Sequence, residues 1–372
     1  ELAHRLQHPR YGVLKTYLAQ IAGQVPRDLG RRLREGIHPE LEMGRFLTDA
    51  VAFSSCVPVL GALEYFGNDG QQMTLAMVQA HVANQGDGWA FTLDYLERHL
   101  EGLRVRMALA HDSGDTGDAD ETHGGFLSQV ATLGQRTAQL HMALARTTGH
   151  AAFDPEPMTG NDLAATQLRT TTELDDTLTL LGQQTARLPA SVQSLAHALT
   201  DRKQALQARI AAIGAMPPGG LKTRYHGDYH LGQVLVSGHD FVIIDFEGEP
   251  GRSFAQRRAK GSPLRDVAGM LRSFSYARWS ALRRIDSAAQ HDVRLAAAAH
   301  QWEQATRQAF LHAYATTQSV GATHDSANDD LLALFEIEKA LYELRYELNN
   351  RADWVAVPLH GLLDLLQTGP AS

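Results

Sequence analysis

A carboxylate, an amide and a second carboxylate follow one another closely near the middle of this sequence. Asp228 and Gln233 lie in the string His226-Gly-Asp-Tyr-His-Leu-Gly-Gln-Val-Leu235, and Asp245 lies in Phe241-Val-Ile-Ile-Asp-Phe-Glu-Gly-Glu-Pro250. Short apolar runs flank a polar, glycine-containing turn between Gln233 and Asp245, which predicts a β-hairpin. Such a hairpin would return Asp245 to the side of Gln233 and gather three oxygen-bearing side chains.

These residue types suit the transfer of a phosphoryl group from Mg-ATP. Kinases use a loop aspartate to accept the hydroxyl proton, an amide a few residues later to hold Mg²⁺, and an aspartate after the next strand to bridge metal and phosphates. Asp228, Gln233 and Asp245 occur in that order. Mg²⁺ needs only a few protein oxygens beside the phosphates. The competing interpretation is a polar hairpin whose side chains cap turns, but the complete string favours the chemistry.

The composition fits a soluble globular enzyme. The chain has 372 residues, of which 44% are apolar and 20% charged, enough for two core-bearing units. A net charge of −8 argues against a nucleic-acid partner, because binding a phosphate backbone needs a basic face. Cys56 is the one cysteine, so we expect a reducing compartment, the cytoplasm, and no apolar run is long enough for a membrane span.

The segment before the hairpin should contain helices and a small sheet. Apolar residues recur at helical spacing over 11–21, and a second helical pattern covers Pro39–Asp49. Three strands are predicted next, at Val57–Leu60, Leu63–Phe66 and Met73–Val82. The glycine-containing stretch Asn84–Trp89 then crosses into a helix, which in a kinase-like protein would connect two lobes.

The rest of the chain is predicted to be helical around the hairpin. An acidic, glycine-rich stretch over 112–125 is typical of a solvated connection. Ser262, Pro263 and Asp266 form a strong helix start. Helices are predicted at Leu127–Ala145, Asp162–Ile213 with a break near Pro189, Ser262–Phe274, Asp292–Ala315, Asn328–Asn349 and from Pro358 onward.

The sequence resembles bacterial maltokinases. The likeness rests on the strings at 226–235, 245–250 and 262–274, and it extends from about Arg31 to about Leu363. That family transfers the γ-phosphate of ATP to maltose, which gives maltose 1-phosphate, and it often occurs fused to trehalose synthase. The resemblance therefore implies ATP and Mg²⁺ as cofactors, maltose as the acceptor and trehalose synthase as a partner.

The resemblance also implies the fold. It is an α+β, protein-kinase-like fold of two lobes, related to the aminoglycoside phosphotransferases. Residues 1–88 would form a small β-containing N-terminal lobe that is truncated or degenerate. Residues 89–372 would form a large, mostly helical C-terminal lobe that contains the catalytic hairpin at 226–250.

Roles in the hairpin follow from the same resemblance. Asp228 would be the base that faces the sugar hydroxyl, and His230 would brace its loop. Gln233 and Asp245 would hold magnesium, and Glu247 would reach a second magnesium through water.

A late segment would bind the sugar. Sugars are held by planar hydrogen-bonding groups beside an aromatic face, and residues of both kinds occur together here. An equally weighted alternative is a helix end whose Arg351 and Trp354 only pack on the preceding helix. The residues implied are Tyr346, Glu347, Asn350, Arg351 and Trp354.

The nucleotide side departs from the family pattern. The strand lysine that binds phosphate would stand near Asp28, which cannot serve, so Lys15 is the remaining candidate although its surroundings favour a helix. No glycine-rich phosphate loop precedes it. Glu40 or Glu42 could pair with such a lysine, or could stabilise a helix N-terminus.

Adenine would be read by backbone groups near Gln79, His81 and Val82. Two explanations for the incomplete nucleotide side stay open, a chain that is part of a longer protein and a natively degenerate lobe.

Three functions are consistent with these residues. The first is ATP-dependent phosphorylation of maltose. The second is a catalytically weak kinase-like module that binds trehalose synthase or a sugar. The third is a kinase for glucosamine or another monosaccharide, because related kinases share the same strings.

Overall fold

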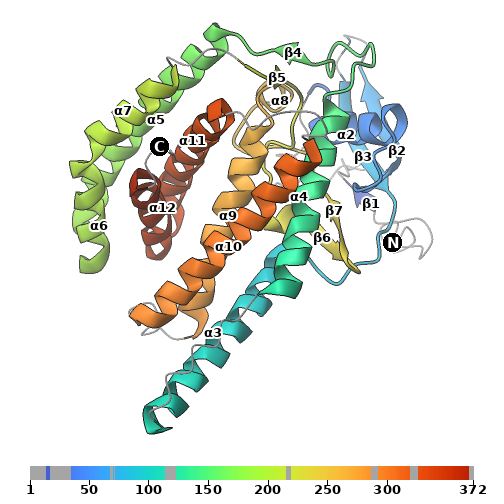
Figure 1. The fold of residues 1–372 in the computed structure, drawn as a ribbon. Helices are drawn as coiled ribbons and strands as arrows, with labels where there is room; N and C mark the ends of the chain where they lie inside the picture. Colours follow the sequence, from blue (N-terminus) through green and yellow to red (C-terminus); the bar gives the residue numbers. More distant parts are fainter. Residues whose placement is uncertain are drawn as a thin grey trace, which may run out of the picture.

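A small β-sheet sits beside a large set of helices in the computed structural model, which describes residues 14–16, 35–67, 70, 72–113, 123–214, 219–285, 292–318 and 326–367. Figure 1 shows the sheet at one side of the molecule and helices α5, α6 and α7 at the other. The fold is α+β, as predicted.

The sheet has three strands in the order β1-β3-β2. Strand β3, Gln72–Gln79, lies in the centre and pairs antiparallel with β1, Leu14–Thr16, and with β2, Val59–Phe66. Helix α2, Pro39–Arg45, continues into a π-helical turn, η1, Phe46–Ala50. Leu41 of this helix packs on Val59 and Met77, so that α2 is fixed against the sheet.

Two sequence predictions in this region are corrected. The helix expected over 11–21 is wrong at Leu14–Thr16, which form β1, and the remainder of that range lies outside the described residues. Pairing with β3 overrides the helical spacing of the apolar residues. The strands expected at Val57–Leu60 and Leu63–Phe66 are one strand, β2, whose register shifts between Val59 and Gly61 and again between Leu63 and Glu64. The helix predicted at Pro39–Asp49 is confirmed.

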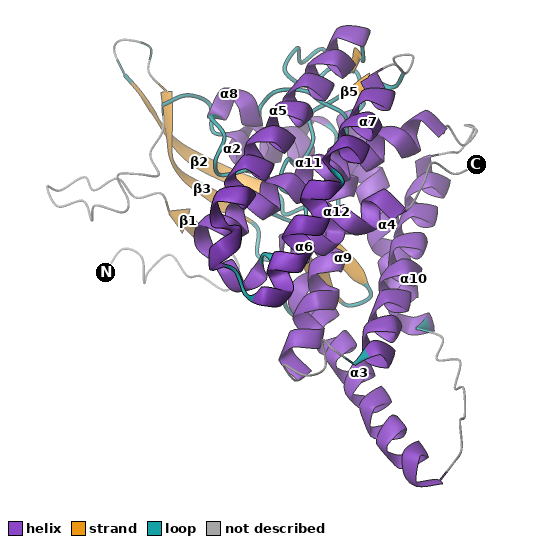
Figure 2. Ribbon diagram, turned by 90° about the vertical axis from the view of Figure 1, so that its left-hand side faces the viewer, coloured by secondary structure: helices purple, strands orange, loops and turns teal. Residues whose placement is uncertain are grey.

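The helical region is built around α9, whose residues are buried on nearly every side. Helices α3, α10 and α11 all pack on α9, and α10 also packs along α4. Figure 2 shows how much of the molecule these helices make up. Their bounds are α3 Gly88–Ser113, α4 Gly124–Leu144, α5 Gly160–Gln184, α6 Ala190–Asp201, α7 Lys203–Gly214, α8 Phe254–Arg257, α9 Leu264–Ile285, α10 Val293–Gln318, α11 Ser326–Asn350 and α12 Ala356–Gln367. Within the described residues, none of the helices combines the length and apolar character needed to cross a membrane.

The predicted hairpin is confirmed. A 3-10 turn, η3, Leu231–Gln233, leads into β6, Val234–Ser237, which pairs antiparallel with β7, Asp240–Ile243. A second two-stranded pair joins β4, Glu156–Pro157, to β5, Leu221–Lys222.

The segment that connects β3 to α3 is bonded to this hairpin. The amide of Gln85 donates to the carbonyl of Val236 at 2.9 Å, and the amide of Val236 donates to the carbonyl of Gly86 at 2.9 Å. The connection is therefore held against the hairpin on its way from the sheet to the helices.

Candidate active site

The 226–233 loop is anchored to the start of α9. Both carboxylate oxygens of Asp266 accept backbone hydrogen bonds, from the amide of His226 at 2.7 Å and from the amide of Gly227 at 2.9 Å. Gly269 lies one turn later and lets the loop approach α9, because a Cβ there would stand 2.5 Å from the carbonyl oxygen of Tyr229. The position of the loop backbone thus depends on the buried carboxylate of Asp266 and on the absence of a Cβ at Gly269.

Side chains from other helices complete this anchor. His141 of α4 places Nε2 3.2 Å from Asp266 Oδ2, and its Nδ1 is 2.8 Å from the hydroxyl of Tyr314. The hydroxyl of Tyr229 lies 2.9 Å from that of Thr137. All these groups are buried, so the loop is held by polar contacts inside the helical core rather than at its surface.

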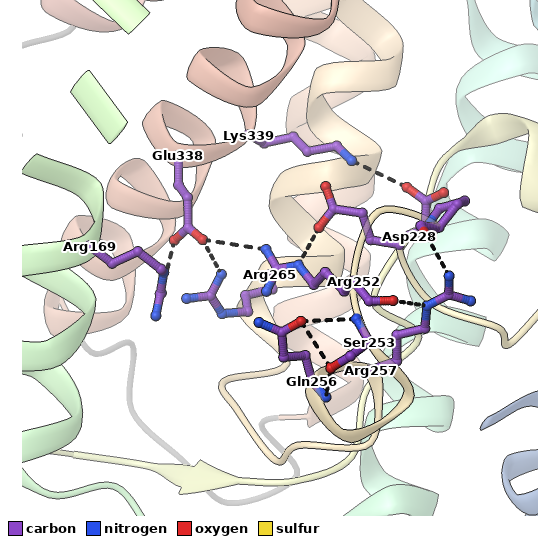
Figure 3. Close-up of polar contacts among 12 residues, drawn as sticks. Arg169, Asp228, Arg252, Ser253, Gln256, Arg257, Arg265, Glu338 and Lys339 are labelled. Atoms are coloured by element: carbon purple, nitrogen blue, oxygen red, sulfur yellow. Dashed lines mark hydrogen bonds and ion pairs between the residues drawn. The ribbon is translucent and has the colours of Figure 1, made fainter. Parts of the chain in front are cut away.

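Asp228 faces positive charge from within this loop and from α11. Lys339 places Nζ 3.2 Å from Asp228 Oδ1 (Figure 3). Burial alone would raise the pKa of Asp228, but the charges of Lys339, His230 and His226 together lower that pKa below its ordinary value. The carboxylate is therefore held in its ionised form, as a general base requires.

His230 keeps the turn of the loop in shape. Its Nδ1 accepts a hydrogen bond from the amide of Gly232 at 3.0 Å. Burial lowers the pKa of His230, and the nearby Asp228 opposes this effect only in part. The geometry agrees with the predicted bracing role, which stays a prediction.

The predicted metal ligands lie together. Gln233 Nε2 is 3.0 Å from Asp245 Oδ2, so the hairpin does bring the amide beside the carboxylate. Carboxylate oxygens of Glu40, Asp245 and Glu247 all lie within 4.8 Å of one another. Mg²⁺ prefers this kind of oxygen donor, and rotation of the Gln233 amide would present its oxygen as well. These residues fit a magnesium ion.

Asp245 has an unusual backbone. Its φ is +65°, and Ala52 is the other residue besides glycine with positive φ among the described residues. Aspartate tolerates this left-handed conformation better than most residues. Strained backbone of this kind clusters at ligand sites, so it supports a functional role for Asp245.

Arginines hold the segment that follows Asp245. Arg257 donates to the carbonyls of Pro250, at 2.6 Å, and Arg252, at 3.0 Å, and it lies 3.7 Å from Glu247. Arg252 in turn pairs with Glu249. In the view of Figure 3, Arg252 and Arg257 lie below Asp228. The segment therefore has a defined shape next to the predicted metal ligands.

Glu338 of α11 closes this network. It accepts from Arg265 at 2.8 Å and from Arg169 at 3.3 Å (Figure 3). Burial would raise its pKa, but Arg265 and Arg169 lower the pKa of Glu338 to about 2. One carboxylate thus joins α5, α9 and α11 beside the site.

A cavity of about 420 Å³ opens beside Lys339 and runs along α11. This volume is in the range of small-molecule sites. Four of the predicted sugar-binding residues line it, whereas the side chain of Asn350 donates to the carbonyl of Tyr346 at 2.8 Å and is not among the lining residues. The four are Tyr346, Glu347, Arg351 and Trp354.

Glu347 is a buried residue of the cavity wall, and it is the centre of a hydrogen-bonded cluster. Its carboxylate accepts from Arg351 at 2.6 and 2.9 Å and from the hydroxyl of Tyr276 at 3.2 Å. The Arg351 guanidinium lies 5.4 Å from the ring centre of Tyr346 and 5.3 Å from that of Trp354. The alternative interpretation was that Arg351 and Trp354 only pack on the preceding helix. Arg351 does contact Trp354, and both residues line the cavity.

The predicted nucleotide residues lie at the sheet. The backbone of Lys15 is in β1 and pairs with Met77 of β3. Gln79 Nε2 donates to Glu40 Oε1 at 3.3 Å, which places the end of β3 near the acidic cluster. His81 and Val82 follow in the connection to α3, where His81 is exposed. Glu42 pairs with Arg224 and Arg258, both at 2.7 Å, so of the two acids considered Glu40 is the one near Asp245.

Three residues of the site were not predicted in these roles. Lys339 contacts the proposed base, Asp266 holds the 226–233 loop, and Glu343 lines the cavity. Asp266 has a sequence signal, since it stands at a strong helix start, but that signal does not reveal its partners. Lys339 and Glu343 lie on the same face of α11 as Tyr346 and Glu347, so helical spacing could have found them.

Similar proteins are sugar kinases. A glucosamine kinase from Streptacidiphilus jiangxiensis is 28% identical over 297 residues, which cover 80% of this chain and 58% of that protein. This chain thus spans less than two thirds of that relative's length. A glucosamine kinase solved in complex with glucosamine, ADP and inorganic phosphate superposes with a TM-score of 0.69 and 26% identity, and the match covers 89% of this chain and 69% of that one.

A short match to a different kind of protein also exists. A stretch of 58 residues is 53% identical to an uncharacterised RNA pseudouridine synthase of Mycobacterium tuberculosis, which is 16% of this chain and 22% of that protein.

The family match covers the loop, the hairpin and the helix that carry the predicted base and metal ligands. The pattern of the phosphotransferase enzyme family matches residues 116–326, which is more than half of the chain. That range contains the 226–233 loop with Asp228, the hairpin that brings Asp245 to Gln233, and helix α9 with Asp266. The chain therefore belongs to the phosphotransferase enzyme family.

Proposed function

We propose that this chain transfers the γ-phosphoryl group of ATP to a hydroxyl of an amino sugar, with glucosamine as the first candidate. One observation carries this proposal. The residue bonded to Asp228, Lys339, lines a cavity whose wall also contains the carboxylates of Glu343 and Glu347. With Asp87, three carboxylates line this cavity against two cations, Lys339 and Arg351. The excess of negative charge attracts a protonated amine, while a sugar hydroxyl could approach the Asp228 side.

Each group then has a role in the reaction. Asp228 takes the proton of the acceptor hydroxyl while the hydroxyl oxygen forms a bond to the γ-phosphorus. The bond between the γ-phosphorus and the β,γ-bridging oxygen breaks, and ADP leaves with its electrons. His230 holds the loop. Asp245, Glu247 and Gln233 would hold Mg²⁺ together with Glu40. When bound, Mg²⁺ neutralises the charge of the phosphates.

The nucleotide would lie between the sheet and the hairpin. In this proposal Lys15 binds phosphate, and Gln79, His81 and Val82 flank the adenine. We further propose that residues 1–88 form the nucleotide lobe and residues 89–372 the acceptor lobe.

The acceptor proposal rests on the relatives and on charge. Glucosamine carries an amine and maltose does not, so the acids of the cavity favour glucosamine. Burial raises the pKa of Glu343, with Arg272 and Lys339 opposing the increase, whereas Glu347 already binds the cation Arg351. An ammonium group would therefore share the Glu347 carboxylate with Arg351. Maltose remains the second candidate because of the maltokinase-like strings, and trehalose synthase is a partner only in that case.

The test is release of ADP in a coupled assay with Mg²⁺ and glucosamine, glucose or maltose, beside Asp228→Ala as the inactive control. We expect the largest kcat/KM with glucosamine. Glu347→Gln should raise the KM for glucosamine more than the KM for glucose. A preference for maltose would overturn the amino-sugar proposal but keep the kinase. Turnover no higher than that of Asp228→Ala with every sugar would favour the catalytically weak binding module instead.

A further inference from the structure

Lys339 lies at the junction of two cavities. It lines the acceptor cavity along α11 and also a second, narrower cavity that Asp228 lines. Its side chain is 25% exposed and that of Asp228 is 21% exposed. The ammonium group lies 5.1 Å from the ring centre of Tyr342, one turn along α11. The lysine is thus held between a ring and the proposed base while it still borders both cavities.

Acidic groups face the ammonium from three segments of the chain. Asp228 faces it from the 226–233 loop, Glu249 from the segment after β7, and Glu343 and the Tyr342 hydroxyl from α11 itself. His226 and His230 face Asp228 from its own loop. Burial would lower the pKa of Lys339, but Asp228, Glu343 and Glu249 raise that pKa above its ordinary value. The lysine therefore keeps its charge throughout the neutral range.

We propose that Lys339 is a positioning residue, which holds the Asp228 carboxylate in the orientation needed to take the proton of the sugar hydroxyl. Lys339 also offsets the negative charge of Asp228 when an anionic phosphoryl group arrives. This inference rests on the proposed kinase function. A carboxylate that must approach a phosphoryl group meets repulsion in a site that also contains Asp245, Glu247 and Glu249. One ammonium group 3.2 Å away reduces that repulsion without being consumed.

Variants of Lys339 distinguish a positioning role from a merely structural role. In Lys339→Met we expect kcat to fall about 10- to 100-fold, as expected for a misplaced general base, with the KM for glucosamine and for ATP within about twofold. The acidic limb of the pH profile of kcat/KM should move up by about one pH unit or more, because Asp228 loses a cation that lowers its pKa. Lys339→Arg retains the charge and should restore the position of that limb.

Two controls make the outcome specific. Lys203→Met removes a different lysine that pairs with a carboxylate, Asp175, at 2.7 Å on the surface of the helical region, and it should leave kcat and the pH profile unchanged. In an Asp228→Asn background the further change Lys339→Met should cost little additional kcat, because the group that it positions is already lost. An unchanged kcat in Lys339→Met, an unmoved acidic limb, or equal losses in both backgrounds would overturn the proposal.

A measurement without turnover distinguishes failure of this inference from failure of the proposed function. The carboxyl ¹³C resonance of Asp228, assigned by its absence in Asp228→Asn, can be titrated in the wild type and in Lys339→Met. A higher pKa in Lys339→Met supports the contact even if no sugar is phosphorylated, in which case only the proposed function fails. Equal titration in both proteins, with an active wild type, refutes the role of Lys339 and keeps the kinase.

Discussion

Replacement of Asp266 by asparagine should both destabilise the protein and slow the reaction. Its carboxylate is 1% exposed and accepts the amides of His226 and Gly227 at 2.7 and 2.9 Å. Hydrogen bonds to a charged group contribute about 1.5–3 kcal/mol each. Asparagine keeps one acceptor, so one bond is lost, a buried N–H loses its partner, and the other bond weakens by about 1 kcal/mol. The sum of the lost bond and the weakened bond is a loss of about 2.5–4 kcal/mol of unfolding free energy.

The assay is urea unfolding followed by tryptophan fluorescence, together with kcat of the native protein. Because the 226–233 loop would move by a fraction of an ångström or more, we expect kcat to fall at least about tenfold. Asp292→Asn is a matched control. Asp292 also accepts two amides, those of Arg294 at 2.9 Å and Leu295 at 3.3 Å, but at the start of α10, where asparagine caps as well as aspartate. If Asp266→Asn is no more destabilised than Asp292→Asn, the anchoring argument is wrong.

The other predictions concern the metal, the nucleotide and pH. Asp245→Asn should keep its stability, because asparagine also tolerates positive φ, yet need at least about tenfold more Mg²⁺ for ADP release; an unchanged Mg²⁺ requirement would contradict the ligand role. Lys15→Met should lower kcat at least about tenfold with an unchanged Mg²⁺ requirement, and full activity would show that Lys15 does not bind phosphate. Glu338 is ionised in the fold down to a pKa of about 2, against an ordinary value of 4.5, so it stabilises the protein above pH 4.5 and that contribution is lost as the pH falls toward 2. The difference in unfolding free energy between the wild type and Glu338→Gln should therefore shrink by about 1 kcal/mol from pH 7 to pH 4, and a constant difference would refute the assignment.

Local patterns predicted the hairpin well. The alternation of apolar residues and the glycine-containing turn are set by neighbours in the sequence, and the structure places Gln233 and Asp245 3.0 Å apart as expected. The strand β2 was less predictable. Its register shift at Gly61 interrupts the pattern, so one strand reads as two.

Contacts between distant segments could not be predicted in the same way. Lys339 lies 111 positions from Asp228 in the sequence, and a lysine on an amphipathic helix ordinarily indicates a solvated face. Asp266 was identified as part of a helix start, which explains its place but not the loop that it holds. Glu40 could be a helix N-terminal acid or a partner for lysine, and its position beside Asp245 depends on how α2 packs on the sheet.

The attachment of the β3–α3 connection to the hairpin limits how the sheet can move relative to the helices. Besides the bonds of Gln85 and Gly86 to Val236, Ser237 Oγ donates to the carbonyl of Ala83 at 2.9 Å. Upstream, the amide of Ala80, just after β3, donates to the carbonyl of Pro58, just before β2, at 2.9 Å. Rotation of one part against the other would therefore concentrate at 81–82, between two anchored ends. These are also two of the positions proposed to flank adenine, so a bound nucleotide would stiffen this joint.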